Sequence, residues 1–520
     1  MRAMSFSSRA ARLARTVRSL HPLQVIARPV SLTLARAIRR TPGAGAPRLR
    51  AGWPPADPFL HAFAARDRAR AAARLARLPQ GAKLRDYEAT YGFELLGDDP
   101  PPPGALPSAP GFAFDPYPAS VRARQLAVAA RLGARGAGRD VELARACRAV
   151  LVQPELHLLG NHVLENGLAL ACGGAAAEGI EADVWWRAGC ALLAWQLPEQ
   201  FLADGGHFEG SASYHLWLLT GLLEAIELAD ASGRGAPDLW RETARAALAW
   251  AAAVRAPDGT YPLFNDAALD AAPALDDVLS LGDTCGLSVY RGAAGEARAA
   301  DATGEARAAL LDPTGWALLA APGAWLAFDA GPDGAAYQPG HVHADALGFE
   351  LWVDGARAVV DYGIESYGDG AGRAATRATR VHSTVEIDDT DSCEVWGGFR
   401  VGRRARARLL ELGADGGSAR AEASHDGYAW LPGGPEHRRR LDLQRGRLEI
   451  TDTVTGPFRR AVSRLRLDAG AAARLRVTAD GDPAPPRPDR WYPRHGDALP
   501  AVVHAREIPP GGVLRWVLEW

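Results

Sequence analysis

Residues 211–232, SASYHLWLLTGLLEAIELADAS, decide the fold of the half of the chain in which they lie. Their apolar side chains recur three and four positions apart, which is the spacing of an amphipathic helix rather than of a strand. Five further segments share this period, at 121–132, 140–152, 161–177, 183–202 and 238–256. Short connections containing Gly, Pro or Asp suggest antiparallel helical hairpins. The pattern leaves open whether these hairpins form a toroid or a plain bundle.

Beyond residue 286 the pattern changes from helical to extended. Short alternating or β-branched segments bounded by Gly, Asp and Pro occur at 315–328, 347–353, 358–361, 383–388, 405–411, 418–424, 428–431, 436–444, 447–455, 461–468, 473–479 and 512–519. Helices followed by strands predict two architectures in sequence, and strands spaced this closely fit an antiparallel sandwich. We therefore predict an α+β multidomain chain, with a basic N-terminal arm at 1–55, an α-helical domain at 56–292, a linker at 293–312 and a β-sandwich domain at 313–520.

The composition excludes several classes of protein. The 520 residues are 48% hydrophobic and 23% charged, which is ordinary for a globular protein and excludes disordered and collagen-like chains. Because 59 basic residues face 61 acidic ones, no general electrostatic field recruits nucleic acid, and we expect no nucleic-acid partner. The five cysteines lack a CxxC pair, which favours buried free thiols over a disulfide framework.

The N-terminal arm carries an unusual charge. Residues 1–50 contain eleven arginines and no Asp, Glu or Lys. Such an arm could lie on an anionic membrane surface as a basic helix or form a solvated extension, and we favour the extension. The chain shows no signal-peptide core and no apolar run of about eighteen residues, so we predict no transmembrane segment. A cytoplasmic, envelope-associated or periplasmic location and the oligomeric state stay open.

Two polar motifs interrupt the helical half. In GNHVLENG, residues 160–167, Asn161 can cap a helix while His162 and Asn166 share one face. In DGGHFEGSASYH, residues 204–215, a glycine-rich loop leads to Tyr214 in the first turn of a helix, where a phenol can donate or accept a proton. Taken alone, capping and packing explain both motifs better than catalysis does.

Two further motifs lie in the β half. In QPGHVHAD, residues 338–345, His341 and His343 point the same way if the chain is extended, about 6.6–6.8 Å apart. Asp361 ends an apolar strand, where a carboxylate needs a partner. His343, Asp361 and His382 together offer two nitrogens and an oxygen, a ligand set that suits zinc if the fold brings them together.

These motifs, in this order, carry a family resemblance. A helical half with GNHxxEN and DGxHxExSxxYH, followed by a β half with QPGHxHAD, VVDYG and TRxHST, resembles the heparinase II/III family of polysaccharide lyases and its alginate-lyase relatives over roughly residues 150–400. The resemblance implies an incomplete (α/α) toroid followed by an antiparallel β-sandwich, with the active cleft between them. It also implies a carbon–oxygen lyase that cleaves a uronic-acid-containing acidic polysaccharide by β-elimination.

The resemblance further assigns roles to particular residues. It implies that Tyr214 is the catalytic acid, and also the base where the two protons lie on the same face of the sugar, and that His341 is a base or a charge stabiliser, depending on the substrate epimer. Asn161 and His162 both match the position that neutralises the uronate carboxylate. His343, Asp361 and His382 match the ligands of a structural zinc ion, and no organic cofactor is implied. The chain reads His382-Ser383 where family members commonly have His-Asn, which weakens the local hydrogen-bonding analogy but keeps the ligand.

The remaining expectations concern substrate contacts and rival functions. We expect Glu209, His215, Arg373, Arg377 and Arg380 to contact the acidic polysaccharide, since arginine binds carboxylate and sulfate in a bidentate manner. One rival is a toroid glycoside hydrolase, which needs two carboxylates about 5–10 Å apart; Glu165, Asp204 and Glu209 are available. The other is a polysaccharide-binding or envelope-assembly protein that has lost catalysis.

Overall fold

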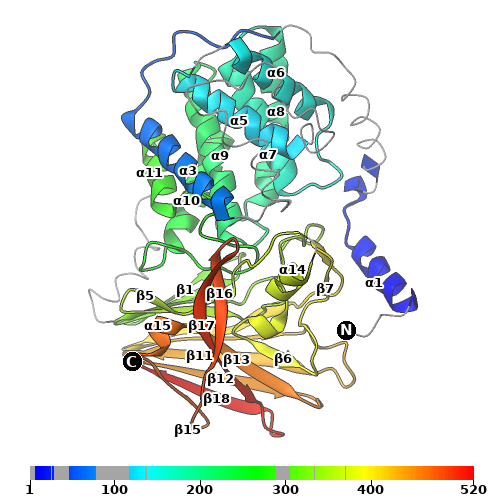
Figure 1. The fold of residues 1–520 in the computed structure, drawn as a ribbon, viewed down its shortest axis with the longest axis vertical. Coiled ribbons are helices and arrows are strands. Elements are labelled where there is room, and N and C mark those ends of the chain that lie inside the picture. Colours follow the sequence, from blue (N-terminus) through cyan, green and yellow to red (C-terminus); the bar gives the residue numbers. More distant parts are fainter. Residues whose placement is uncertain are drawn as a thin grey trace.

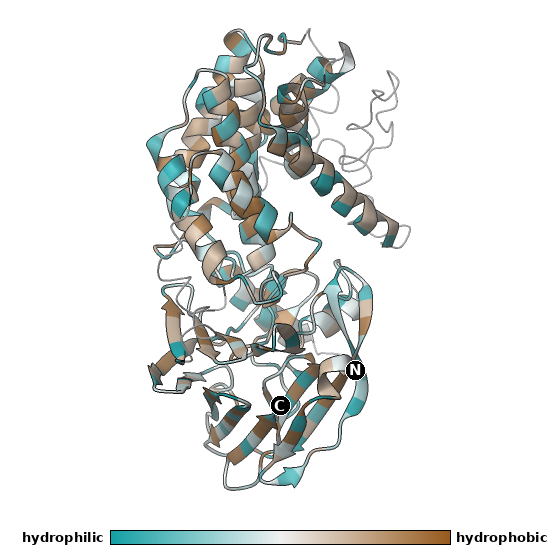
Figure 2. Ribbon diagram, turned by 90° about the vertical axis from the view of Figure 1, so that its left-hand side faces the viewer, coloured by the Kyte–Doolittle hydropathy of each residue, from teal (hydrophilic) through white to brown (hydrophobic). Residues whose placement is uncertain are grey.

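A helical half and a β half lie one above the other (Figure 1). The computed structural model describes residues 6–24, 26–27, 46–77, 116–134, 137–288, 305–332, 334–368 and 370–520. Hydrophilic and hydrophobic residues alternate along most elements, as expected where each element has one buried face (Figure 2). No helix in the described parts of the chain has the length and apolar character that crossing a membrane demands.

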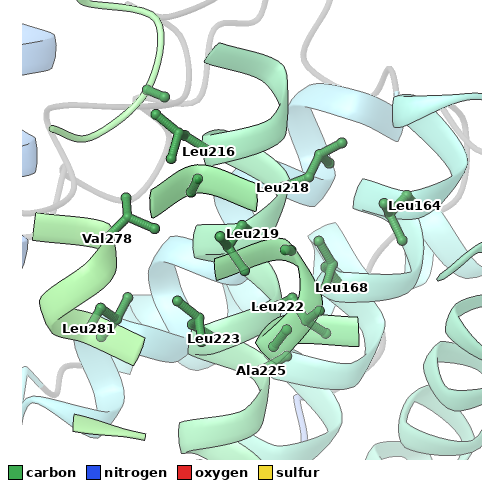
Figure 3. Packing of buried hydrophobic residues seen from close by; sticks show 14 of the residues in the cluster. Leu164, Leu168, Leu216, Leu218, Leu219, Leu222, Leu223, Ala225, Val278 and Leu281 are labelled. Atoms are coloured by element: carbon green, nitrogen blue, oxygen red, sulfur yellow. The ribbon is translucent and has the colours of Figure 1, made fainter. Parts of the chain in front are cut away.

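All six helices predicted from the apolar period are present, with shifts of a few residues at their ends. The helical half contains α3 (Pro58–Arg77), α5 (Pro116–Arg131), α6 (Ala137–Val152), α7 (Asn161–Ala176), α8 (Ile180–Gln200), α9 (Ala212–Ala231), α10 (Asp238–Ala253) and α11 (Leu275–Thr284). The sequence analysis missed α11, which is short. Helix α7 packs against α5, α8 and α9, and leucines of α7 and α9 fill the space between them (Figure 3).

Helices α7 and α8 approach closely because glycines face the contact. A Cβ atom on Gly189 would lie 2.4 Å from the backbone nitrogen of Ala171, and one on Gly174 would lie 2.5 Å from that of Trp186. Larger side chains at either position would push the helices apart. This packing fixes the direction in which the N-terminus of α7, with Asn161 and His162, faces the β half.

In its described residues the β half contains two large antiparallel sheets and a two-stranded hairpin. The first has the order β1-β2-β3-β4-β5-β13-β17-β16, with β6 paired to β13, and the second has the order β15-β14-β18-β12-β11-β10-β9. The bounds of the first sheet are β1 (Arg307–Leu311), β2 (Trp316–Ala321), β3 (Ala324–Asp329), β4 (Phe349–Val353), β5 (Ala356–Val359), β6 (Val385–Ile387), β13 (Ala461–Asp468), β16 (Arg487–Arg494) and β17 (Asp497–Glu507). Those of the second are β9 (Ala407–Asp415), β10 (Ser418–His425), β11 (Glu436–Gln444), β12 (Arg447–Thr455), β14 (Arg476–Ala479), β15 (Asp482–Pro483) and β18 (Val513–Glu519).

The first sheet is the middle layer of the molecule. Along β2, alternate residues belong to two different hydrophobic cores. Trp316 and Leu318 pack with the helices, whereas Ala317 and Leu319 pack with the second sheet. Every residue of β2 and β3 is therefore buried. The two halves share one continuous apolar interface, and the loops at that interface hold the polar motifs.

Three sequence expectations are corrected by the sheets. Residues 307–311, which we placed in a linker at 293–312, form β1, while residues 289–304 lie outside the described residues. Residues 428–431, predicted as a strand, form a turn. Strands β16 and β17 were missed because their prolines resembled turn signals; β16 is an edge strand, where proline is tolerated.

The described part of the N-terminal arm is folded against the protein. Helix α1 (Phe6–Arg18) lies beside the hairpin formed by β7 (Val395–Trp396) and β8 (Arg400–Val401). Thr16 accepts a hydrogen bond from Trp396 and donates one to the carbonyl of Val401. Gln24 donates to the carbonyls of Leu158, in the helical half, and Tyr337, in the β half. The solvated extension that we favoured is therefore wrong for these residues.

Candidate active site between the two halves

The site is organised around Asp266, in the connection between α10 and α11. The neighbouring Asn265 adopts a left-handed φ of 58°, and its side chain donates to the carbonyl of Gly210 and accepts from the backbone N–H of His343. Ser211 and Ser213, at the start of α9, both donate to the carbonyl of Asp266. The serines of the SxSY motif thus hold the Asp266 loop against the first turn of α9.

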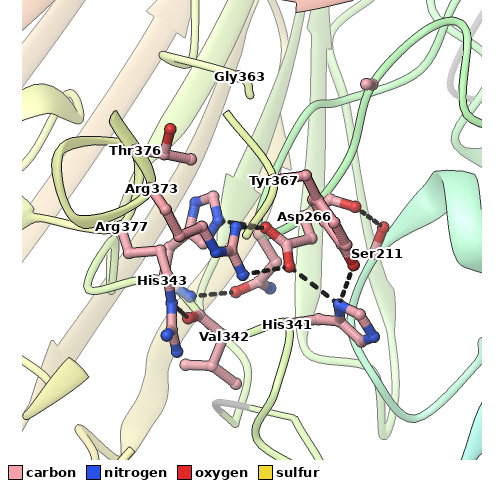
Figure 4. Close-up of polar contacts among 12 residues, drawn as sticks. Ser211, Asp266, His341, Val342, His343, Gly363, Tyr367, Arg373, Thr376 and Arg377 are labelled. Atoms are coloured by element: carbon pink, nitrogen blue, oxygen red, sulfur yellow. Dashed lines mark hydrogen bonds and ion pairs between the residues drawn. The ribbon is translucent and has the colours of Figure 1, made fainter. Parts of the chain in front are cut away.

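The carboxylate of Asp266 is fully enclosed by side chains of the β half (Figure 4). His341 donates from Nδ1 at 2.9 Å, His343 donates from Nε2 at 2.8 Å, and Arg373 pairs with both carboxylate oxygens. Burial alone would raise the pKa of Asp266, but Arg373 and the two histidines hold it well below its usual range. Asp266 is therefore ionised and fixes the orientation of both imidazoles.

His341 is also contacted from the helical half. Because its Nδ1 donates to Asp266, its Nε2 can accept from the Asn161 amide, whose Nδ2 lies 3.4 Å away. Glu209 accepts from the backbone N–H of Asn161 at 3.1 Å and places its other oxygen 3.6 Å from His341 Nε2. Glu209 is completely buried, so it supports Asn161 and His341 from behind rather than facing solvent.

Two tyrosines complete the cluster. Tyr214, in the first turn of α9, hydrogen-bonds through its hydroxyl to the hydroxyl of Tyr367, and its ring centroid lies 4.0 Å from that of His341. The Tyr367 hydroxyl lies 3.1 Å from His341 Nδ1. Burial, with smaller contributions from Tyr367 and Asp266, raises the pKa of Tyr214 well above its ordinary value. Tyr214 is therefore a neutral phenol at neutral pH and is suited to donate a proton.

His162 stands next to Asn161 on the helical wall of the site. Its Nδ1 lies 3.0 Å from the Glu155 carboxylate, and its ring centroid lies 4.6 Å from that of Tyr117. Asn166 also donates to Glu155 and accepts from its backbone N–H. Glu155 is thereby fixed and holds an Nδ1–H on His162. The side chain of His162 is 27% exposed, so it is more accessible than Asn161.

His343, Asp361 and His382, the predicted metal ligands, lie together. Ligand atoms of all three are within 4.8 Å of one another. His382 Nδ1 lies 2.8 Å from Asp361 Oδ2. Among the described residues, nothing hydrogen-bonds to the buried His343 Nδ1 or His382 Nε2. Two buried nitrogens without partners are costly unless a ligand satisfies them, and the contact from Asp266 to the other nitrogen of His343 resembles the outer support of a zinc ligand.

The predicted substrate-binding residues are mostly enclosed by protein. Arg373 and Arg377 are almost fully buried, and each donates to the carbonyl of Gly398. His215 is buried, and its Nε2 donates to the carbonyl of Ala247. Arg380 is exposed but sits beside Asp391. We therefore assign structural roles to Arg373, Arg377 and His215 rather than direct contact with the substrate.

Two members of the cluster were missed by the sequence analysis. Asp266 lies 75 and 77 positions before the two histidines that it orients, so no local spacing connects it to them. The polar pair Asn265-Asp266 between apolar residues was the only signal available. Tyr367 is a single tyrosine in a glycine-rich loop, and its position carries no pattern.

Comparisons with known proteins agree on one family. The family models for the heparinase II/III N-terminus and the heparinase II/III-like C-terminal region match residues 148–280 and 303–496. A heparin-sulfate lyase of Bacteroides stercoris is 32% identical over 113 residues, which are 21% of this chain and 17% of that protein. The matched segment thus spans less than a fifth of that relative.

Solved structures share the fold. A crystal structure of heparinase III superposes with a TM-score of 0.62 at 16% identity, covering 94% of this chain and 88% of that one. The heparan sulfate lyase HepC from Pedobacter heparinus superposes with a TM-score of 0.54 at 16% identity, covering 94% and 82% of the two chains. At these identities the likeness concerns architecture.

Proposed function

Because the chain belongs to the heparinase II/III family of polysaccharide lyases, we propose that it cleaves a uronic-acid-containing acidic polysaccharide by β-elimination. This reaction needs an acid for the departing C4 oxygen, a base for the C5 proton and a group that neutralises the carboxylate. The observation that carries the proposal is the series of contacts at the junction of the two halves, in which the Tyr214 hydroxyl bonds to the Tyr367 hydroxyl and the Tyr367 hydroxyl lies against His341 Nδ1 above Asp266.

Tyr214 is the acid in this proposal. Its hydroxyl is protonated because burial raises its pKa, and Tyr367 hydrogen-bonds to it. When Tyr214 gives its proton to the C4 oxygen, the Tyr367 hydroxyl can donate to the phenolate that forms. A positioned hydrogen bond of this kind stabilises charge that develops only during the reaction. Tyr367 therefore supports the proton transfer without performing it.

His341 is the base. Asp266 accepts a hydrogen bond from the Nδ1–H of His341, so Nε2 carries the lone pair that can take the C5 proton. The imidazolium that then forms has the buried Asp266 carboxylate as its counter-charge. Substrate would displace the weak 3.4 Å contact from Asn161. The released Asn161 amide and the exposed His162, with its Glu155 partner, are the two groups that can face the carboxylate. The Asn161 amide donates a hydrogen bond to developing negative charge, whereas His162, whose Nδ1–H faces Glu155, donates from Nε2 as the imidazolium.

His343, Asp361 and His382 would hold a zinc ion. Their donor set and the two unsatisfied nitrogens fit that metal. A zinc ion there would supply a fixed cross-link between the segments that carry these ligands, and would hold the backbone beneath His341. The proton transfers themselves belong to Tyr214 and His341. Elemental analysis of purified protein tests the assignment, since zinc at one equivalent is expected and its absence would count against it.

The decisive experiment is the Tyr214→Phe variant. Incubation of the wild-type protein with alginate, heparan sulfate or an acidic exopolysaccharide should yield an unsaturated product that absorbs in the ultraviolet. Loss of the proton donor should lower kcat by about 100-fold or more, the range typical of general acid–base groups. Tyr428→Phe is the matched control, because it removes a buried hydroxyl that contacts the Val385 carbonyl and Thr379 rather than the cluster around Tyr214. An active Tyr214→Phe enzyme would remove Tyr214 from the mechanism.

The geometry gives less support to a hydrolase. Glu165 is buried and held by Arg124 and Trp217, and Asp204 accepts from the backbone N–H groups of Gly206 and Thr314. Both carboxylates are thus engaged by the protein, and Glu209 is buried against Asn161 and His341. Product absorbance separates the two reactions, because hydrolysis creates no double bond. Binding of a uronate polymer without any turnover would instead support a non-catalytic protein.

A further inference from the structure

The β7–β8 hairpin forms a wall of the active site. The carbonyl of Gly398, in its turn, accepts hydrogen bonds from Arg373 at 2.9 Å and from Arg377 at 3.1 Å. These buried arginines place Phe399 beside the reaction centre, with its ring centroid 5.2 Å from Tyr367 and 6.3 Å from His341. Phe399 is 37% exposed. A polysaccharide that extends out of the site past Phe399 would therefore contact the β7–β8 hairpin.

Arginines stack on aromatic rings along the hairpin as it leads away from Phe399. Trp396 and Arg400 are paired across the hairpin, and the guanidinium lies 4.9 Å from the ring centroid. Arg12 of α1 lies 6.0 Å from the same ring. Further along the chain, Arg403 lies 4.3 Å from the ring of Trp430, which is 47% exposed. Such pairs present a flat apolar face together with a fixed positive charge.

The arginines outnumber the acids that contact them. Arg12, Arg15 and Arg403 all lie within ion-pair distance of one carboxylate, that of Glu394. Arg400 is exposed and forms no ion pair with any described residue. Four arginines against one carboxylate leave an excess of three positive charges in this group. An uncompensated cluster of one sign raises the local concentration of ligands of the opposite sign.

We propose that Arg12, Arg15, Arg400 and Arg403, with Trp396 and Trp430, form a subsite for the sulfate or carboxylate groups of sugars that lie beyond the cleaved bond. Arginine suits such groups because its guanidinium donates in a bidentate manner and also stacks on rings. The inference rests on the proposed function, since the ligand is a longer stretch of the same polysaccharide. It also assigns a binding role to the N-terminal arm, which contains none of the family motifs.

Chain-length dependence tests the subsite. In Arg400→Gln and Arg403→Gln enzymes, KM for long heparan sulfate or alginate, whichever is cleaved, should rise about fivefold per substitution, the upper range for an exposed ion pair. The kcat should be unchanged, as should KM for the shortest oligosaccharide that is cleaved. Arg445→Gln, an exposed arginine in the β11–β12 turn at the far end of the second sheet, is the control. An unchanged KM for the long polymer would overturn the proposal.

A binding measurement separates this inference from the reaction. Tyr214→Phe protein, with or without Arg400→Gln and Arg403→Gln, is titrated with heparan sulfate, alginate and neutral dextran. Binding of one acidic polymer that weakens in the arginine variants and at higher salt supports the subsite even if no turnover occurs. Equal binding by both proteins, or no binding of either acidic polymer, overturns it even if the wild-type protein is an active lyase.

Discussion

Asp266 joins the two halves through the hydrogen bonds that its carboxylate accepts. It belongs to a loop of the helical half, yet His341, His343 and Arg373 of the β half all bind its carboxylate. One residue thus sets the orientation of the proposed base and of one proposed zinc ligand. A change there should affect stability, metal content and catalysis together, which distinguishes it from a residue that acts in the reaction alone.

The Asp266→Asn variant tests this role. The amide cannot accept from three donors, and it leaves the buried Arg373 without its counter-charge. We expect a loss of about 3 kcal/mol in the free energy of unfolding, the usual result of breaking a buried ion pair, a lower zinc content and a large fall in kcat. Urea denaturation, elemental analysis and the absorbance assay measure these effects. Asp415→Asn, on the exposed end of β9, should change none of them.

Individual site residues were predictable only where neighbours in sequence carried the pattern. Tyr214 and His341 were named from local motifs, and the structure brings them into contact. Tyr367 and Asp266 were missed because long stretches of chain separate them from the groups they touch. The expectation that Arg377 contacts the polysaccharide failed for a different reason. Its sequence context shows a charge, but not that the guanidinium is buried under the Gly398 carbonyl.

At the scale of elements, a buried polar network links the strands of the β half. Asp452 of β12 accepts from Arg439 and His437 of β11 and from Ser463 of β13. Arg439 also donates to the carbonyl of Ser383, the residue after His382. The network therefore crosses from the second sheet to the first and ends beside a proposed metal ligand.

Strong acid should weaken this network. Burial would raise the pKa of Asp452, but Arg439 and His437 lower it. A carboxyl group whose pKa is lower in the folded than in the unfolded state stabilises the protein at pH values above its unfolded-state pKa of about 4. This contribution disappears as the pH falls through the folded-state pKa. Asp452→Asn should lose about 3 kcal/mol at pH 7 and show a shallower decline in stability between pH 5 and 3.

Urea denaturation at each pH provides this comparison between the wild-type protein and the Asp452→Asn variant. Asp415→Asn is again the control, since that carboxylate is exposed and should leave the pH dependence as in the wild-type protein. Parallel stability curves for the wild-type protein and Asp452→Asn would show that Asp452 does not contribute to the acid sensitivity.

The Glu394 carboxylate holds α1 against the β7–β8 hairpin together with the hydrogen bonds of Thr16. Glu394 binds both Arg12 and Arg15, so Glu394→Gln should loosen the helix. We expect trypsin to cleave after the arginines of α1 several times faster in this variant, because proteolysis follows the population of the open form. Glu411→Gln, a more exposed glutamate that also pairs with arginines, is the matched control. Equal cleavage rates would indicate that the other contacts suffice to hold α1.

At the scale of the whole molecule, the sequence predicted the layers better than their connections. The apolar period distinguished helices from strands, and the bounds of β11 and β12 agree with the prediction because a hairpin is a local structure. The pairing of β13 with β5 and β17, in contrast, joins segments far apart in the chain. Alternation shows which face of a strand is buried, but not which distant strand lies beside it.

The same topology has a consequence for quality control in the cell. Strand β18 lies inside the second sheet between β14 and β12, and its Trp516 is fully buried in the core. Until this strand is in place, the backbone edges of β12 and β14 have no partner on that side. Exposed edges of this kind pair with other chains. Molecules in which β18 is missing or unpaired should therefore aggregate rather than persist as partly active enzyme.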